Sequence, residues 1–556
     1  MVKNVFFFLA LFLTVQNASS QKFNWAKQTK TVPGYEAFSF GEVVEATEEG
    51  YFFGGVFQGK VLLEKDTLAE NKELPNSNLA GDVILFKTDK QGNILWKHQI
   101  GGNDYYWDDV LALAVDSKGS SYWAVSLTGN NLLDGKPFLF SKQGTPILKF
   151  DSQGNLMDTI FSPIGAKKLK IDPQDHLYVL GSYYGDLTLD DTTLALSSKA
   201  VNMVVTKYAP DGNLLWATHA GGTETEWTGT EVIGLDMVFN PEGSLFLLGT
   251  LKNNAAQEIH AWFGSLPVPE RGGENPFGFV CQLNVDGRFN WVQTDSGVFE
   301  RIQVMNNGNI LLASSYAYVF TSKFVQLEEG DYTKRALVLE LDPSAQQLIS
   351  TTRLASLGTD ELTISDFERD AAGNTYLAGG FAEGVTCGSL SISSSTIKTY
   401  ILKFSPTGTP TDLLKTEVTD WGNSLQLSAD DATNDLILCG RLDGTKVFGT
   451  ILLETDVNTS NIVYASMQQK GLPLSLANEN TITPDWNILP NPATDELRWN
   501  GIDLSEVKEI RIESMDGTTH PLLPNQRIDI SEFASGIYVL VIETAETTFK
   551  KRFMKI

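Results

Sequence analysis

The sequence predicts an all-β chain: a seven-bladed β-propeller followed by a small immunoglobulin-like β-sandwich. Three observations support this prediction. A unit of four short strands recurs along most of the chain, and the C-terminal segment alternates apolar and polar residues with a period of two. The 48 glycines and 10% aromatic residues also fit many strands joined by tight turns. Six and eight blades are the alternatives to seven.

The composition narrows the class of partner. The chain has 556 residues, and its 42 Lys+Arg against 68 Asp+Glu give a formal net charge of −26. A content of 42% hydrophobic and 20% charged residues is typical of a folded protein. The acidity repels phosphate backbones, so we expect no nucleic-acid partner.

Residues 1–20 are predicted to be a secretory signal peptide. A short basic start is followed by the apolar stretch from Val5 to Val15, and Ala18 and Ser20 are the small residues expected before a cleavage site. Cleavage is therefore expected between Ser20 and Gln21. A membrane anchor is the alternative, but this stretch is shorter than the roughly 20 apolar residues that span a bilayer. We expect no transmembrane segment after removal of the signal.

Residues 21–470 contain the repeats. One clear copy runs from Val83 to Trp96 and continues through Gly101-Gly102, and another runs from Met203 to Trp216 and continues through Gly221-Gly222. A period of roughly 50 to 75 residues with four strands per copy indicates propeller blades, because such sheets bury both faces only by packing side by side. Partial copies at both ends of this region predict that they complete one blade between them and close the ring. The repeats resemble a bacterial β-propeller repeat family marked by Trp, Gly-Gly and Asp-x-x-Gly-Asn.

The C-terminal part begins after a linker, residues 471–484. Residues 485–556 resemble the C-terminal sorting domain of the type IX secretion system, which Bacteroidetes use. The resemblance rests on an opening motif, a turn, a strand pair and a basic tail, whose residues include Pro490, Asn491, Pro492, Gly517, Gly536, Tyr538, Lys550 and Lys551. It implies contact with the type IX machinery, passage through the periplasm, and a final place at the outer cell surface or outside the cell.

Several motifs are better explained by structure than by chemistry. The Asp-x-x-Gly sequences, such as Asp89–Gly92, predict hairpin turns with glycine at positive φ, and a calcium loop is the weaker interpretation because its oxygen ligands are missing. Trp96 and Trp216 resemble the tryptophans that join blades in quinone-dependent dehydrogenases, but no quinone pocket is indicated. We predict no cofactor and no metal, and no catalytic residue is assigned. The sequence does not decide whether Cys387 and Cys439 form a disulfide.

One cluster could bind a ligand. Aromatic residues follow the Gly-Gly pairs and occupy a longer insertion, and loops at equivalent places in a propeller lie on one rim. The alternative is that they pack over blade edges. The candidates are Tyr105, Tyr106, Trp107, Trp227, Trp262 and Phe263.

The sequence therefore favours a secreted or surface-attached binding module, without enzymatic activity, for a glycan or protein ligand that it does not identify. The alternatives are a carbohydrate-active or other hydrolytic or lyase propeller enzyme with a dispersed site, and a structural spacer. The enzyme predicts acidic residues from several blades that converge at one mouth of the channel, whereas the binding module predicts aromatic and acidic loops without such convergence.

Overall fold

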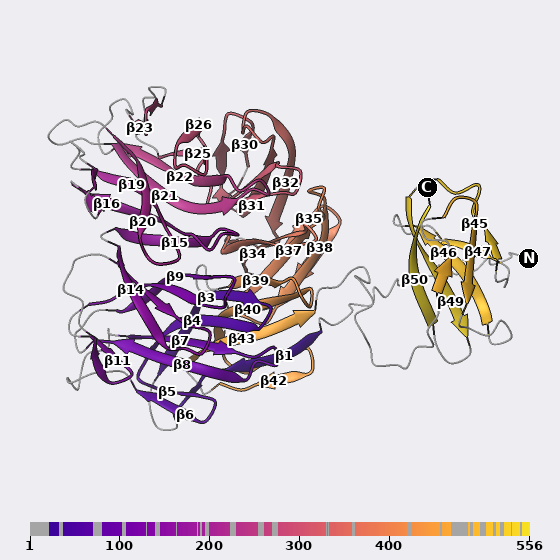
Figure 1. Ribbon diagram of the computed structural model, residues 1–556, viewed down its shortest axis with the longest axis horizontal. Coiled ribbons are helices and arrows are strands. Elements are labelled where there is room, and N and C mark those ends of the chain that lie inside the picture. The colour runs from indigo at the N-terminus through magenta and orange to yellow at the C-terminus, as the bar shows by residue number, and fades with distance from the viewer. Residues whose placement is uncertain are drawn as a thin grey trace, which may run out of the picture. The chain divides into compact units, whose positions relative to one another are not determined.

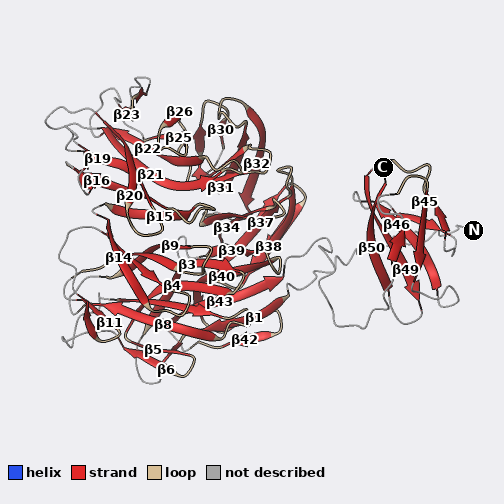
Figure 2. Cartoon of the chain, viewed as in Figure 1, coloured by secondary structure: helices blue, strands red, loops and turns tan. Residues whose placement is uncertain are grey.

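The computed structural model describes two parts of the chain: residues 22–468, with gaps at 33–36, 70–80, 103–106, 129–130, 139–144, 163, 186, 190–191, 195–199, 223–229, 254–260, 269–275, 330, 332, 359–361, 420–424 and 456–458, and residues 487–555, with gaps at 490–492, 501–506, 515–518, 523–526, 535 and 545–547. Their regular structure is β-strand throughout (Figure 2). The chain divides into two compact units, Met1–Lys470 and Gly471–Ile556. In the described part, no helix could span a membrane. The expected signal peptide and the linker 471–484 lie outside the described residues.

The first unit is a β-propeller (Figure 1). Seven antiparallel units of four strands, the blades, are present in the described residues. The strands of each blade are given from the inner to the outer one. Blade 1 contains β3 (Phe38–Thr47), β4 (Gly50–Gln58), β7 (Asp82–Thr88) and β8 (Ile94–Gly101); blade 2 contains β9 (Asp109–Val115), β10 (Ser121–Ser126), β13 (Thr145–Phe150) and β14 (Leu156–Ser162); and blade 3 contains β15 (Gly165–Ile171), β16 (Leu177–Tyr184), β19 (Val201–Tyr208) and β20 (Leu214–Gly222).

The other four blades follow the same order. Blade 4 contains β21 (Thr230–Phe239), β22 (Leu245–Asn253), β25 (Phe277–Leu283) and β26 (Phe289–Asp295), and blade 5 contains β27 (Arg301–Val304), β28 (Ile310–Ala317), β31 (Lys334–Leu341) and β32 (Leu348–Ser356). Blade 6 contains β33 (Asp366–Arg369), β34 (Thr375–Phe381), β37 (Lys398–Phe404) and β38 (Pro410–Thr416), and blade 7 contains β39 (Gln426–Asp430), β40 (Asp435–Asp443), β43 (Ser460–Gln468) and β1 (Phe23–Gln28).

The blades form a closed ring. Each inner strand contacts the inner strand of the next blade, and β39 of blade 7 contacts β3 of blade 1. The middle strands are covered on both faces by neighbouring blades, so every residue of β7 and β37 is buried, whereas the outer strand β8 is largely half-exposed. Strands buried on both faces need continuous apolar runs, and this explains the sequence of the repeats. The predicted propeller is confirmed.

The N-terminal strand closes the ring. β1 pairs antiparallel with β43, from Phe23 opposite Met467 to Gln28 opposite Val463. The amide of Asn24 also donates a hydrogen bond to Asp435 Oδ2 at 2.6 Å. The two ends of the propeller thus complete one blade between them, as the partial repeat copies predicted.

Tryptophans on three of the outer strands attach a blade to the next one. The indole N–H of Trp96, in blade 1, donates to the carbonyl of Ser152 in blade 2 at 3.3 Å, and the ring lies on Gly154, where a Cβ would come within 2.7 Å of an indole carbon. Trp216 of blade 3 lies in the same way on Gly287 of blade 4, within 2.6 Å of such a Cβ. Gly154 ends the turn that begins at Asp151, and Gly287 ends the equivalent turn that begins at Asn284, so the turn and the tryptophan form one contact between blades.

The Asp-x-x-Gly turns are held by hydrogen bonds from their own backbone to the aspartate side chain. Asp89 Oδ1 accepts hydrogen bonds from the backbone N–H of Gln91 at 2.9 Å and of Asn93 at 2.8 Å, and Gly92 has φ of +76°. The carboxylate therefore holds its own turn together, and glycine adopts the left-handed conformation at little cost. The prediction of a hairpin turn is confirmed.

Replacing Gly154 with alanine should weaken the contact between blades 1 and 2. Gly154→Ala places a methyl group against the Trp96 indole and also forces alanine to φ of +86°. We expect it to lower the free energy of unfolding in urea by about 1–3 kcal/mol more than a matched glycine does, because overpacking adds to backbone strain. The control is Gly135→Ala, where φ is +75° but nothing lies within 4 Å of the new methyl. Equal losses for the two variants would contradict a contact between turn and tryptophan.

A short hairpin is inserted between the second and third strands of every blade, a feature that the sequence analysis missed. Several of these hairpins have two-residue turns at positive φ, such as Asp134 and Gly135 at +51° and +75°, which is the geometry favoured by twisted strands. The seven, in order along the described chain, are β5 (Lys60–Leu63) with β6 (Asp66–Ala69), β11 (Asn131–Leu133) with β12 (Lys136–Phe138), β17 (Leu187–Leu189) with β18 (Thr192–Leu194), β23 (Ala261–Phe263) with β24 (Leu266–Pro267), β29 (Val319–Thr321) with β30 (Gln326–Glu328), β35 (Gly384–Cys387) with β36 (Leu390–Ser393), and β41 (Lys446–Phe448) with β42 (Ile451–Leu453).

The three cysteines are all free and buried. Cys281 and Cys439 lie in the middle strands β25 and β40, and Cys387 ends β35. The disulfide considered between Cys387 and Cys439 is therefore not formed, and the ring is held by burial and by contacts between blades.

The second unit consists of two sheets around one core. One sheet contains β44 (Asn487–Leu489), β45 (Glu496–Asn500) and β48 (Arg527–Asp529), and the other β47 (Thr519–Leu522), β46 (Val507–Ser514), β49 (Gly536–Thr544) and β50 (Thr548–Lys555). Leu497 and Ile528 of the first sheet belong to the same buried cluster as Ile510 and Leu540 of the second. Two sheets with a shared core are the arrangement expected of a small sandwich.

Candidate functional site

Strand direction decides which loops share a face of the propeller. In a four-stranded meander, the second strand ends and the third begins at the same edge, and there the outer strand also leads into the next blade. The seven hairpins and the segments after the Gly-Gly pairs therefore lie on one face, which we call the hairpin face. The Asp-x-x-Gly turns lie on the opposite face, the turn face.

Exposed aromatic side chains gather on the hairpin face. Among the described residues, the exposed tryptophans and tyrosines are Trp107, Tyr184, Trp262 and Tyr318. Trp107 precedes the inner strand β9, Tyr184 ends β16 just before a hairpin, and the other two lie in or beside hairpins. The exposed aliphatic residues at the start of outer strands, such as Leu95 and Leu215, lie instead on the turn face.

The aromatic residues predicted to lie on one rim differ in their exposure to solvent. Trp107 is 40% exposed and Trp262 is 46% exposed. Phe263 is fully buried and packs against Phe279 and Phe289, with ring centroids 4.8 and 5.4 Å away, so it holds its hairpin on the propeller. Tyr105, Tyr106 and Trp227 lie outside the described residues.

The remaining predicted residues belong to the two ends of the chain. Within the described part, Tyr538 donates a hydrogen bond to the carbonyl of Ala534 at 2.9 Å, and Gly536 begins β49. Lys550 and Lys551 lie in β50. The residues outside the described ranges are Ser20, Gln21, Pro490, Asn491, Pro492 and Gly517.

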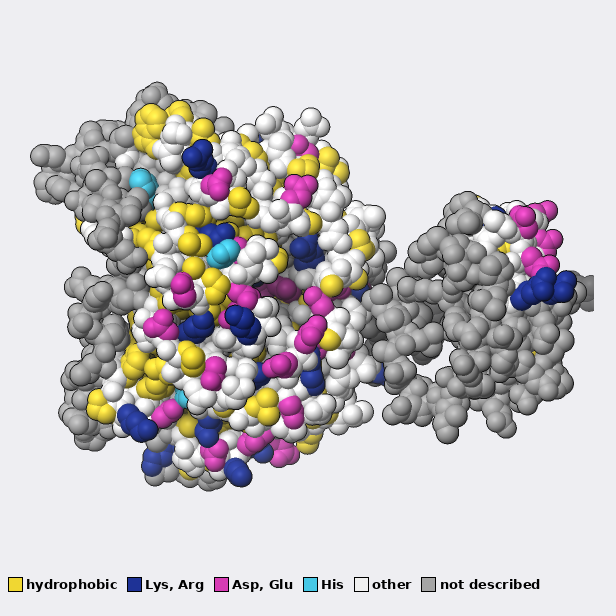
Figure 3. Space-filling view, viewed as in Figure 1, with side chains coloured by type: hydrophobic (Ala, Val, Ile, Leu, Met, Phe, Trp, Pro, Cys, Tyr) yellow, Lys and Arg dark blue, Asp and Glu magenta, His cyan; other side chains and the backbone are white. Residues whose placement is uncertain are grey.

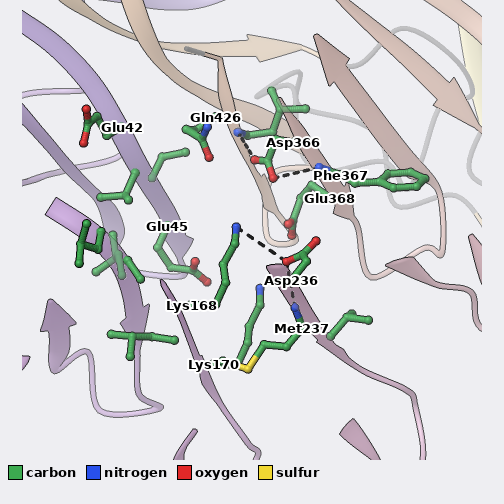
Figure 4. A pocket seen from close by; sticks show the side chains of 18 of the residues that line it. Glu42, Glu45, Lys168, Lys170, Asp236, Met237, Asp366, Phe367, Glu368 and Gln426 are labelled. Carbon is green, nitrogen blue, oxygen red and sulfur yellow. Dashed lines mark hydrogen bonds and ion pairs between the residues drawn. The ribbon is translucent and has the colours of Figure 1, made fainter. Parts of the chain in front are cut away.

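The centre of the ring contains a second candidate, a channel lined by all seven inner strands (Figure 4). Its cavity is about 110 Å³, and acidic and basic side chains converge on it. Figure 4 shows Glu45, Lys168, Lys170, Asp236 and Glu368 directed towards one another across it. The sequence analysis missed these residues, because in a sequence a charged residue on an inner strand cannot be distinguished from one on a surface strand.

Two channel carboxylates join neighbouring blades. Asp236 Oδ2, in blade 4, accepts the backbone N–H of Ile302 in blade 5 at 3.2 Å. Asp366 Oδ2, in blade 6, accepts that of Leu427 in blade 7 at 2.8 Å. These two acids therefore satisfy backbone donors across the joints between blades, which is a structural task.

The other channel charges depend on one another. Burial raises the pKa of Glu368 to about 8, the positive charge of Lys170 opposes the increase, and Asp366 and Glu45 add to it. Burial alone would lower the pKa of Lys170, but the carboxylates of Glu368, Glu45 and Asp236 raise it. The channel thus contains an ammonium group among acids, of which Glu368 is mostly protonated at neutral pH.

A carboxyl pair lies where blades 1 and 2 meet. Glu42, on β3, is hydrogen-bonded to Asp109 at the start of β9. Burial and then this hydrogen bond raise the pKa of Glu42 to about 10, so Glu42 is protonated at neutral pH. With its carboxyl groups at hydrogen-bonding distance, the pair is too close for the acid and base of a glycosidase, which are about 5 to 9.5 Å apart.

The surface carries both kinds of charge. Figure 3 shows acidic, basic and hydrophobic side chains interspersed over the drawn face of the propeller. His98, on β8, contacts blade 2 and its hairpin: one ring nitrogen lies 2.7 Å from Asp134 Oδ2 and the other 2.8 Å from the carbonyl of Gly154. Among the described residues, no group of three or more His, Cys, Asp or Glu side chains could hold a metal ion.

Comparison with known families identifies the second unit. Residues 487–556 match the family described as the secretion system C-terminal sorting domain. The chain is therefore exported by the type IX secretion system, to the cell surface or the extracellular space. The resemblance predicted for residues 485–556 is confirmed.

Comparison with solved structures finds distant likenesses. A protein of unknown function from Bacteroides caccae is 11% identical, with 61% of this chain and 92% of that chain covered and a TM-score of 0.31. BamB from Moraxella catarrhalis is 10% identical, with 81% and 100% covered and a TM-score of 0.29. A Synechocystis apocarotenoid oxygenase is 12% identical, with 79% and 94% covered and a TM-score of 0.35. No curated protein matches the chain.

Proposed function

We propose that the propeller is an extracellular binding module without enzymatic activity, and that its hairpin face holds a glycan or protein ligand. One observation carries the proposal: the exposed aromatic residues of the described chain, Trp107, Tyr184, Trp262 and Tyr318, all lie on that face. Aromatic side chains offer large contact areas at low cost in conformational entropy, and they dominate binding surfaces. The sorting domain delivers this face to a place where extracellular ligands are available.

The test compares the two faces of the propeller. The secreted protein is applied to an array of extracellular glycans and proteins, together with a variant carrying Tyr184→Ala, Trp262→Ala and Tyr318→Ala. We expect this hairpin-face variant to lose at least tenfold in affinity for the array ligand, because truncating central aromatics removes about 2 kcal/mol or more each. A matched variant on the turn face, Leu95→Ala with Leu215→Ala, should bind as the wild type does. Loss on the turn face alone would overturn the proposal.

The convergence of acids in the channel favours a second candidate, a hydrolytic enzyme. Protonated Glu368 could act as a general acid, and Glu45, which also lines the channel, as a base. The cavity of about 110 Å³ is small against the roughly 300–1,000 Å³ of ligand pockets, so we rank this candidate second. Release of reducing sugar from a polysaccharide panel, abolished by Glu368→Gln in a folded protein, would favour the enzyme over the binding module.

A further inference from the structure

The indole of Trp107 is a rigid platform on the hairpin face. It lies against the Cα of Gly81, where a Cβ would come within 2.4 Å of two ring carbons. The backbone is fixed at the same point, because Asp108 N–H donates to the Gly81 carbonyl at 3.0 Å. The Asp108 carboxylate in turn accepts the N–H of Gly102 at 2.9 Å and of Thr128 at 2.8 Å. The benzo ring of the indole is therefore held against the backbone of Gly81, and the side chain still has 40% of its surface exposed.

Two side chains from neighbouring blades extend this platform. The ring of Phe40, on β3 of blade 1, lies 6.4 Å from that of Trp107 at an angle of 38°. The guanidinium carbon of Arg441, on β40 of blade 7, lies 4.9 Å from the centroid of the Phe40 ring. Arg441 Nε donates to Asp443 Oδ1 at 2.8 Å, so the charge is balanced and the side chain is oriented. Three blades thus meet in one row of aromatic and polar groups.

The row lies at the hairpin-face end of the central channel. Phe40 and Trp107 each precede, by two residues, a member of the Glu42–Asp109 pair. Glu42 lines the channel itself. Because the pKa of Glu42 is raised by burial, its carboxyl group adds no negative charge there at neutral pH.

The chemistry of this row restricts the ligand. A protein partner needs about 800 Å² on each side of a stable interface, far more than one indole and its neighbours provide. An anionic polymer would meet the Asp109 carboxylate and the −26 charge of the chain. A neutral sugar avoids both problems, because the C–H face of a pyranose ring covers an indole while its hydroxyl groups bond to polar groups at the edge, here the guanidinium and the carboxylates.

We infer that Trp107, with Phe40 and Arg441 beside it, is a stacking site for a neutral pyranose ring. This inference rests on the proposed binding function of the hairpin face and specifies its ligand class. It also explains why Gly81 has no side chain, since any Cβ there would displace the indole.

The experiment is calorimetric titration of the secreted protein with five neutral hexasaccharides: maltohexaose, cellohexaose, xylohexaose, mannohexaose and laminarihexaose. At least one should bind the wild type. Trp107→Ala should weaken that binding at least tenfold, and Trp107→Phe should keep most of it because an aromatic face remains. Gly81→Ala should weaken binding without touching the ligand, by moving the indole.

Two controls report on the fold, Gly165→Ala, where the new methyl lies 3.6 Å from its nearest neighbour, and Leu215→Ala on the turn face. Both should bind as the wild type does. The inference is overturned if none of the five sugars binds, or if Trp107→Ala binds as tightly as the wild type. If the array ligand of the hairpin face still binds while all five sugars fail, only the sugar assignment is lost. If neither binds, the proposed function is lost as well.

Discussion

Deleting residues 22–31 should abolish the cooperative unfolding of the propeller. The deletion removes β1 and β2 (Lys30–Thr31), so blade 7 keeps three strands and β43 becomes an exposed edge. It also removes Trp25, whose indole N–H donates to the carbonyl of Lys90 in blade 1 at 2.8 Å and whose ring lies on Gly92. The loss combines a lost strand pairing with a lost contact between blades, on the order of 5 kcal/mol or more, comparable to the net stability of many domains.

Thermal unfolding followed by circular dichroism would measure this effect. We expect the truncated chain to be insoluble or to melt without a sharp transition, whereas Trp25→Ala alone should keep a cooperative but lower transition. Adding a peptide of residues 22–31 should restore part of the lost stability, because it can pair with β43 in the register of β1. A truncated chain that melts as the wild type does would show that the N-terminal strand is not needed to close the ring.

The stability of the propeller should fall as the pH rises towards 8, and Glu368→Gln should reduce this dependence. The pKa of Glu368 is about 8 in the folded chain against 4.5 for the free group, so the folded state binds this proton more tightly than the unfolded state does. Stability contributed by the protonated group is therefore present below pH 4.5 and is lost progressively between about 4.5 and 8. A shift of this size corresponds to a few kcal/mol.

Urea unfolding at pH 5, 7 and 9 would test the prediction. Glu368→Gln keeps a neutral, isosteric side chain, so its advantage over the wild type should grow from pH 5 to pH 9. Glu49→Gln is the matched control, since the Glu49 side chain is 69% exposed and should change little. Equal pH profiles for the wild type and Glu368→Gln would show that Glu368 has an ordinary pKa.

Lys170→Met should lower the stability of the propeller, because it removes the basic member of the same cluster. It removes the positive charge that Glu368, Glu45, Asp236 and Asp366 surround. We expect a loss of about 3–5 kcal/mol at neutral pH, which is the usual effect of removing one partner from a buried charge cluster. The loss should shrink at pH 4, where the acids take up protons, and in the double variant with Glu368→Gln. A loss independent of pH would point to packing rather than charge.

The sequence was informative where a feature repeats or obeys the periodicity of strands. Asp89–Gly92 and its equivalents could be recognised as turns because Asx turns need a short acceptor and a glycine at fixed spacing. Trp96 recurs at one place in the repeat, and its role between blades was suggested by the resemblance to the tryptophans of quinone-dependent dehydrogenases. The ring closure by β1 followed from two incomplete copies at the ends of the region.

Other features had no such signal. Trp262 and Phe263 were grouped as one candidate although neighbours on a strand face opposite sides, so only the first is exposed. The inserted hairpins have strands of two to four residues in most blades, too short for a clear alternation. Lys170 and Glu368 come from strands far apart in the sequence, and among 68 acidic residues nothing distinguished those that face the channel.

The hairpins have a consequence for engineering. Each is attached at the same point of its blade. Those of blades 3, 5 and 7 form separate two-stranded sheets, whereas β11, β23 and β35 pair with the outer strand of the preceding blade and β5 pairs with β2. The tips of the hairpins therefore offer several places where a foreign loop could be grafted while the strands that anchor each hairpin stay in place. Exchanging hairpins between blades, one at a time, would produce a family of surfaces on a constant frame, in the way that variable loops diversify an antibody domain.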